Sequence, residues 1–239
     1  MSGHSKWATT KHKKALVDSK RSKVFSKFSN SIAIAARGGK DPSANPSLRD
    51  IIAKARSFNM PNENIDRAIK RGSGEIPGTM IEEYLIEAYG PEGIAILIRA
   101  ITDNKNRTLG SIRSILNDYS GRLAETGSVQ WMFTETICFD IPAPTWQAHP
   151  DLSMLVIDAG ATGIEDNTET TTILCGKQSA EKIKKTLLEQ KVEFESYIDY
   201  RTNNPITIVD ESKLSTITRL VETLDECEDI DDIHLNASL

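Results

Sequence analysis

The chain has 239 residues, of which 38% are hydrophobic and 26% are charged, and its formal net charge is −5. This composition is typical of a globular protein with about one to three domains. No apolar run approaches the roughly 20 residues that cross a bilayer, which excludes an integral membrane protein, and we expect no membrane partner. Three distant cysteines, Cys138, Cys175 and Cys227, favour free or buried thiols over a disulfide framework. Because the amino terminus lacks a secretory signal, we expect a cytoplasmic protein.

Charge is polarised along the chain. Residues 1–72 carry 16 basic and 5 acidic side chains, a net charge of +11, whereas the remaining 167 residues carry 13 basic and 29 acidic ones, a net charge of −16. Clustered Lys and Arg displace condensed counterions from a phosphate backbone, which favours binding to nucleic acid. A solvated surface that keeps the protein soluble is the less informative alternative.

Residues 1–75 are predicted to form a small basic domain of three helices. Lys20, Lys23 and Lys27 lie opposite the apolar stripe of the first helix. Residues before about Lys20 show no such stripe, so we expect a mobile basic arm that becomes ordered on its partner. Apolar residues at helical spacing place the helices at Phe25 to Ala36, stopping near Gly38, at Leu48 to Ala55, and at Pro61 to Gly72.

Residues 76–134 are predicted to begin a central α/β sandwich domain after a glycine-rich linker. The expected elements are strands at Ile81 to Ala88 and Gly93 to Thr102, a helix from Ile112 to Tyr119 and a strand from Ser128 to Phe133. The tail, residues 204–239, offers only a strand at Ile206 to Val209, a helix at Leu214 to Leu224 and a strand near Ile233 to Leu235. We therefore expect the tail to complete the central sandwich.

Residues 135–203 are predicted to form a second α/β domain inserted in the first. The pattern predicts strands at Thr136 to Ile141, Thr170 to Cys175 and Phe194 to Tyr200, helices at Leu152 to Ala159 and Ala180 to Glu189, a Pro-rich turn at 142–144 and an acidic loop at Gly160 to Asn167. The fold class expected is α+β: a small three-helix domain followed by two α/β sandwich domains, one inserted in the other.

The sequence contains none of the short motifs that mark catalysis. There is no P-loop, dinucleotide-binding glycine pattern or nucleophile elbow. The histidines and cysteines show no metal-ligand spacing. We therefore expect no enzyme activity, no cofactor, no metal site and no small-molecule substrate.

The segment from Asp103 to Thr108 gathers polar groups between a strand and a helix. Free N–H groups at a helix start, together with Lys105 and Arg107, suit a phosphate. Capping of the helix by Asp103 or Asn104, with solvated charges, explains the same residues equally well. The sequence leaves both interpretations open.

The chain resembles the YebC family in five segments that occur in the family's order and spacing: Gly3-His4-Ser5-Lys6-Trp7, Lys11-His12-Lys13-Lys14, Asn59-Met60-Pro61, Asp103-Asn104-Lys105-Asn106-Arg107-Thr108 and Gly121-Arg122-Leu123-Ala124. The resemblance implies a helical N-terminal domain, a central α/β domain completed by the C-terminal segment, and an inserted α/β domain. It also implies DNA-binding transcriptional regulation, as described for most members. Some members, including the mitochondrial translational activator of cytochrome oxidase, are instead described as ribosome-associated translation factors that relieve stalling.

We expect a non-enzymatic nucleic-acid-binding regulator of gene expression, with DNA or ribosomal RNA, and with it the ribosome, as partner. Phosphate contact alone does not separate these partners, although no convincing recognition helix is visible in the first 72 residues. A third alternative is an adaptor whose arm binds an acidic protein. Trp7 and His12 could stack on unpaired bases or pin the arm to the helical domain. The expected contact residues are Lys6, Trp7, Lys11, His12, Lys13, Lys14, Lys20, Lys23, Lys27, Asn104, Lys105 and Arg107.

Overall fold

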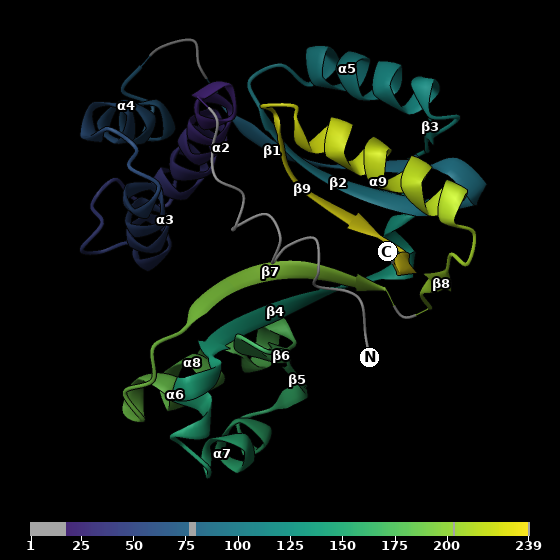
Figure 1. Ribbon diagram of the computed structural model, residues 1–239. Helices are drawn as coiled ribbons and strands as arrows, with labels where there is room; N and C mark the ends of the chain where they lie inside the picture. Colours follow the sequence, from purple (N-terminus) through teal and green to yellow (C-terminus); the bar gives the residue numbers. More distant parts are fainter. Residues whose placement is uncertain (1–17, 77–79, 203, 239) are drawn as a thin grey trace. The chain divides into compact units, whose positions relative to one another are not determined.

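The computed structural model describes residues 18–76, 80–202 and 204–238 (Figure 1). Its helices and antiparallel sheets confirm the predicted α+β class, with a helical region at the N-terminal side. Contacts divide the described residues into two compact units. The larger unit contains the residues up to Met132 and those from Asn204 onward, and the smaller unit contains the residues between them.

Three helices open the larger unit: α2 (Asp18–Ala36), α3 (Pro46–Ser57) and α4 (Asn62–Gly72). Asn45 links the first two, because its side-chain oxygen accepts from the N–H of Leu48 at the start of α3 and its amide donates to the Ala35 carbonyl of α2. The helices share an apolar core whose buried residues are Ile32, Ala36, Leu48, Ile52, Ala55, Met60, Ile65 and Ala68.

Helices α2 and α4 approach so closely that only glycine fits at their contact. A Cβ atom placed on Gly72 would lie 2.0 Å from the carbonyl oxygen of Ala33, and Ala33 itself is fully buried. The glycine that the sequence marks as the end of the third helix is therefore also a packing site.

The larger unit contains a four-stranded antiparallel sheet in the order β3-β1-β2-β9. Its strands are β1 (Glu82–Tyr89), β2 (Ala95–Thr102), β3 (Arg122–Leu123) and β9 (Ile230–Leu235), with a 3₁₀ turn, η1 (Pro91–Gly93), between the first two. Helices α5 (Lys105–Asp118) and α9 (Glu211–Asp225) cover one face of this sheet (Figure 1). The expectation that the tail joins the sheet agrees with the pairing of β9 with β2.

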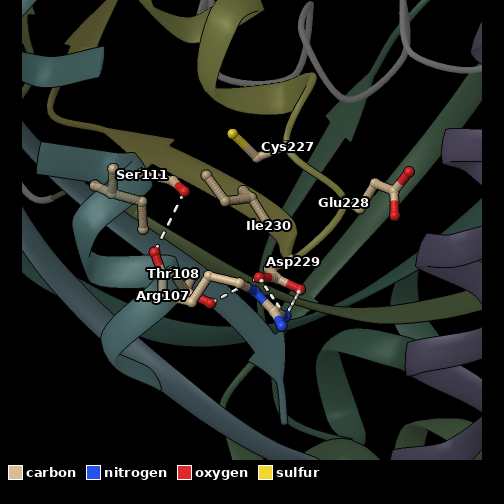
Figure 2. Close-up of a pocket in the computed structure, with 8 residues that line it drawn as sticks. Arg107, Thr108, Ser111, Cys227, Glu228, Asp229 and Ile230 are labelled. Atoms are coloured by element: carbon tan, nitrogen blue, oxygen red, sulfur yellow. Dashed lines mark hydrogen bonds and ion pairs between the residues drawn. The ribbon is translucent and has the colours of Figure 1, made fainter. Parts of the chain in front are cut away.

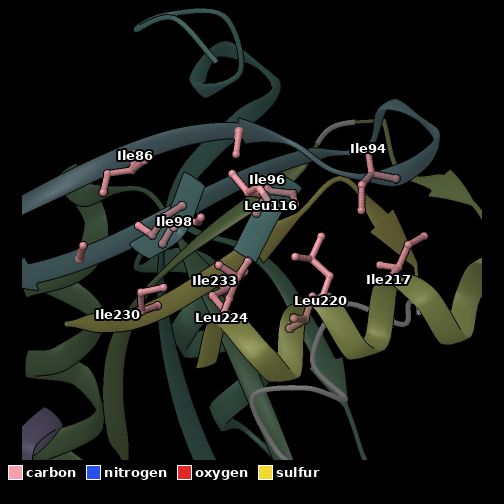
Figure 3. Close-up of a cluster of buried hydrophobic side chains, with 14 of the residues drawn as sticks. Ile86, Ile94, Ile96, Ile98, Leu116, Ile217, Leu220, Leu224, Ile230 and Ile233 are labelled. Atoms are coloured by element: carbon pink, nitrogen blue, oxygen red, sulfur yellow. The ribbon is translucent and has the colours of Figure 1, made fainter. Parts of the chain in front are cut away.

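The main core lies between that sheet face and its two helices. Figure 3 shows Ile96 and Ile98 of β2 and Ile233 of β9 directed toward Leu220 and Leu224 of α9, and all five side chains are buried. On the opposite face of β2, Ile101 packs with Ala33 of α2 and with Ile81. Apolar residues on both faces explain why β2 reads as an almost continuous apolar run.

The smaller unit has a β-α-β-β-α-β arrangement, with all four strands antiparallel in the order β5-β6-β4-β7. Its core on one sheet face includes Phe139, Ile141, Ile173, Ile183 and Leu187. The elements are β4 (Phe133–Pro142), α6 (Ala143–Gln147), α7 (Leu152–Asp158), β5 (Ala161–Asp166), β6 (Thr170–Cys175), α8 (Lys177–Glu189) and β7 (Glu195–Thr202).

The predictions for two loops and one strand were wrong. The segment predicted to be an acidic loop forms strand β5, because Ile164 pairs with Ile173 of β6 and gives this polar segment an apolar face. The Pro-rich turn begins α6, since proline is tolerated in the first turn of a helix. The predicted strand over Ser128 to Phe133 is a 3₁₀ turn, η2 (Gln130–Met132), followed by β4.

The expected strand over Ile206 to Val209 is shorter in the structure. It is β8 (Ile206–Thr207), which pairs with β10 (Ala237–Ser238).

Glu87 explains the missing strand before Phe133. Its side chain is 5% exposed and accepts hydrogen bonds from the backbone N–H groups of Gly127, Val129 and Gln130. These donors are therefore unavailable for a sheet ladder. Burial alone would raise the pKa of Glu87, but the three hydrogen bonds outweigh it and hold the pKa below the usual glutamate value.

We expect Gly72→Ala to destabilise the protein by roughly 1–3 kcal/mol, because the new methyl group collides with the backbone of α2. Gly110→Ala is the matched control. It lies inside α5 with open space around its Cβ position, so we expect a gain of about 0.5–1 kcal/mol. Urea denaturation of both variants measures the difference, and equal midpoints would contradict the close contact.

We expect Glu87→Gln to lower the free energy of unfolding at pH 7 by roughly 1.5–3 kcal/mol, because a charged acceptor of three hydrogen bonds is lost. The folded pKa is depressed, so the stabilisation is present above the unfolded pKa of about 4.3 and is lost as the pH falls through the lower folded value. The difference between wild type and variant should therefore shrink below about pH 4. Glu125→Gln, at an exposed position nearby, should change little at either pH.

Candidate nucleic-acid interface

A groove rich in cations lies on the helical region, between α3 and α4. It encloses about 510 Å³, and Lys40, Arg49, Arg56 and Lys70 line it together with two acidic residues, Asp66 and Glu75. Apolar side chains, including the buried Ile52 and Ile65, contribute to its lining. With four cations and two acids, the groove is therefore a surface of net positive charge between two helices.

Helical geometry brings the groove's cations together. Arg49 and Arg56 are seven residues apart on α3, a spacing that places both on one face. Lys40 reaches the groove from the α2–α3 loop and forms an ion pair with Glu75, with 2.8 Å between Nζ and Oε1. That hydrogen bond raises the pKa of Lys40, which keeps its ammonium group protonated. The side chains of Lys40 and Arg49 remain 67% and 56% exposed.

Two of the cations predicted on the first helix, Lys23 and Lys27, have acidic partners within the same unit. Lys23 lies 3.7 Å from Glu226, with 40% of its side chain exposed. Lys27 lies 2.7 Å from Asp225 with only 14% of its side chain exposed. Lys27 is therefore poorly placed to contact a phosphate, because its ammonium group already contacts a carboxylate in a largely enclosed position.

Further contacts along α2 show why Lys27 faces inward. The Asn30 amide donates to the carbonyl oxygens of Ile101 and Glu228, and the Ser31 hydroxyl donates to Asp231. Helix α2 thus packs against the sheet as well as against α3 and α4. The sequence revealed only one apolar stripe, so its opposite face read as solvent-exposed.

The predicted arm residues Lys6, Trp7, Lys11, His12, Lys13 and Lys14 lie outside the described residues, and Lys20 lies in α2 at a position where only the backbone is described.

The segment from Asp103 to Thr108 forms the start of α5, and Figure 2 shows its Arg107 and Thr108 side chains beside Asp229. Asn104 is the N-cap, because its side chain accepts from the N–H of Arg107. The Arg107 guanidinium lies 3.2 Å from Asp229, and the Thr108 hydroxyl donates to the same carboxylate at 2.7 Å. Its ion pairs raise the pKa of Arg107, with Asp229 as the main cause.

These contacts favour the capping interpretation of this segment. Asp229 and Glu228 line the adjacent cavity of about 420 Å³ (Figure 2), so a phosphate there would meet carboxylates. Lys105 lies over the ring of Tyr84, 4.6 Å from its centroid. Asn104, Lys105 and Arg107 thus each have a partner within the protein.

In the part of the chain that the structure describes, little points to a reactive thiol or to a metal site. Cys138, Cys175 and Cys227 are free thiols, as expected, and burial raises the pKa of Cys138 to about 12. Such a thiol is a poor nucleophile at neutral pH. Over residues 18–76, 80–202 and 204–238, no group of three His, Cys, Asp or Glu side chains is placed to hold a metal ion, and no helix is long and apolar enough to cross a membrane.

The sheet of the smaller unit is a poor platform for RNA bases. On its two central strands, Cys138 and Asp140 of β4 and Thr172 and Leu174 of β6 face away from the helices. RNA-binding sheets of similar topology carry aromatic residues on this face, and the fully described strands β4 and β6 have none there. Tyr197 of β7 lies on the same face, but its hydroxyl donates to Asp140, so it is already engaged within the sheet.

Sequence reasoning missed the four groove cations as a set. Arg49 and Arg56 were detectable, since seven-residue spacing on one helix is a local signal. Lys40 and Lys70 come from other segments, so their convergence depends on how the helices pack.

Comparison with known proteins gives the family. The description "TACO1/YebC protein N-terminal domain" matches residues 5–75, and "TACO1/YebC second and third domain" matches residues 81–237. The chain belongs to the TACO1/YebC family. The resemblance inferred from five short segments is confirmed.

Individual TACO1/YebC relatives are similar over almost their full length. A probable transcriptional regulatory protein of Thermotoga petrophila is 41% identical over 234 residues, which cover 98% of this chain and 91% of the relative. One of Corynebacterium glutamicum is 41% identical, with 100% and 96% covered. The crystal structure of a conserved hypothetical protein from Aquifex aeolicus is 34% identical, covers 97% of this chain and 96% of its own, and has a TM-score of 0.83.

We expect Asn104→Ala to destabilise the protein by about 1 kcal/mol, because α5 loses its N-cap. Asn106→Ala, exposed two residues further on, should stay within about 0.5 kcal/mol of wild type. Thermal unfolding measures both. Unchanged stability of Asn104→Ala combined with weaker oligonucleotide binding would support the phosphate interpretation instead.

Proposed function

We propose that this protein is a non-enzymatic, cytoplasmic regulator of gene expression that binds nucleic acid through its N-terminal region. The observation that carries the proposal is the groove between α3 and α4, where four cations and two acids converge on a chain with a net charge of −5. Exposed Lys and Arg arranged along a groove follow a phosphate backbone and release its counterions.

The sequence that precedes α2 is also rich in cations. Lys6, Lys11, Lys13 and Lys14 precede α2 in sequence, and Asp18 is the only acid among the first 40 residues. The acidic remainder of the chain repels phosphates, so it orients nucleic acid toward the helical region. Trp7 and His12 supply either base stacking or anchorage of the arm.

The names of the relatives support a regulator, and DNA-binding transcriptional regulation is the first form of the proposal. One observation favours the alternative, a ribosome-associated translation factor. Helix α4, which follows the short turn after α3, presents exposed Glu63 and Asp66 in its first two turns. A helix that reads bases in the major groove uses these N-terminal positions, and carboxylates there face phosphates unfavourably.

We expect the double variant Arg49→Gln, Arg56→Gln to bind oligonucleotides more weakly and with a shallower salt dependence. Each lost phosphate contact should reduce the slope of log K against log salt by roughly 0.7 to 0.9. The same titration with Lys11, Lys13 and Lys14 changed to Glu tests the arm.

The matched control is Lys177→Gln, Lys185→Gln, which removes two cations that are 82% and 78% exposed on α8. This control should bind as wild type does. If groove and control variants lose affinity equally, or if neither groove nor arm variants change the slope, the proposed interface is wrong.

Crosslinking in growing cells, followed by nuclease digestion and sequencing of the bound nucleic acid, distinguishes a transcriptional regulator from a translation factor. Discrete promoter DNA indicates a transcriptional regulator, whereas ribosomal RNA clustered at one site indicates a translation factor. A partner that remains bound after nuclease treatment indicates the protein adaptor and contradicts the proposal.

A further inference from the structure

Trp131 is unusually exposed for a tryptophan. It is 70% accessible in η2, whereas tryptophan is highly buried on average. The exposed residues beside it, Glu125, Thr126, Gly127 and Gln130, are polar or lack a side chain. The indole is therefore a single large π-surface within a polar setting.

The indole is held in place by its own turn. Its Nε1–H donates to the carbonyl oxygen of Ser128 at 2.9 Å, and the Tyr89 hydroxyl donates to the same oxygen at 3.2 Å. The N–H of Met132 donates to the carbonyl of Val129, which closes the turn. The ring thus has a defined position despite its exposure.

The turn is anchored in the sheet. The buried carboxylate of Glu87 on β1 binds the N–H groups of Gly127, Val129 and Gln130, on both sides of Ser128. The surface around Trp131 is therefore preorganised. Binding of a ligand there costs the protein little conformational entropy.

A cation lies in the same region. Arg122 of β3 pairs with Tyr89 of β1, and its guanidinium lies 5.1 Å from the centroid of the Tyr89 ring. Tyr89 in turn contacts the carbonyl that fixes Trp131. Arg122, Tyr89 and Trp131 thus form a connected set, which we call the indole platform.

We propose that the indole platform stacks an unpaired nucleotide base on Trp131, with Arg122 contacting the adjacent phosphate. Aromatic rings stack on bases regardless of sequence, and a base inside a duplex has no free face to offer. An apolar protein partner would instead require a contiguous apolar patch, and the polar neighbours of Trp131 do not supply one. The inference rests on the proposed function and assigns a single-stranded segment of the nucleic acid to this site.

The test measures binding of a labelled 12-nucleotide single-stranded RNA and of the matching duplex to the full chain. Trp131→Ala should weaken single-strand binding about 5- to 150-fold, since one stacked base contributes roughly 1–3 kcal/mol. Trp131→Phe should retain most of the affinity, and duplex binding should not change. Met154→Ala, at an equally exposed position on α7, should bind the single strand as wild type does.

A second readout follows the ring itself. In the variant Trp7→Phe, Trp146→Phe, the remaining tryptophan is Trp131, and the single strand should quench its emission. Wild type that binds neither probe would overturn the proposed function and this inference together. Binding of the single strand with equal affinity by wild type and Trp131→Ala, or without quenching, would overturn the indole platform alone.

Discussion

The antiparallel pairing of β9 with β2 is the contact on which the larger unit depends. It joins residues 230–235 to residues 96–100, so the last part of the chain completes a sheet that begins at Glu82. With β9 comes α9, which supplies Ile217, Leu220 and Leu224 to the main core. Asp225 at the end of α9 and Asp229 just before β9 supply the carboxylates that meet α2 and α5. The N-terminal helices are therefore held in part by residues near the end of the chain.

Charge has two uses in this unit. Along α2 and at the start of α5, Lys27 and Arg107 face Asp225 and Asp229, and these pairs join the two helices to the end of α9 and to the connection that follows it. In the groove between α3 and α4, Arg49 lies 4.0 Å from Asp50 with 56% of its side chain exposed, and Arg56 donates to Asn62. The net charge of residues 1–72 counts Lys27, with 14% of its side chain exposed, in the same way as Arg49. Exposure and partner geometry, more than charge density, therefore decide which cations remain accessible to a polyanion.

The parts of the fold that local patterns govern were predictable. Helices α2, α3 and α4 follow from apolar periodicity and from boundary signals such as Gly38 after α2 and Pro61 before α4, and β6 follows from its apolar run. The failures have non-local causes. Strand β5 depends on pairing with β6, and the turn before β4 depends on Glu87, 40 residues earlier. The partner of Lys27 lies 198 residues away, so no local pattern could identify it. For the same reason the groove, built from two helices and a loop, was only partly visible in the sequence.

The first and last strands of the smaller unit lie next to each other. Phe133, where β4 begins, pairs with Thr202, where β7 ends, and Cα atoms of such antiparallel partners are about 4.5–5.5 Å apart. The chain thus enters and leaves this unit at neighbouring positions. Joining Met132 to Asn204 through a few residues would close the larger unit without altering the β3-β1-β2-β9 sheet. Such geometry allows an entire domain to be gained or lost during evolution in one insertion or deletion.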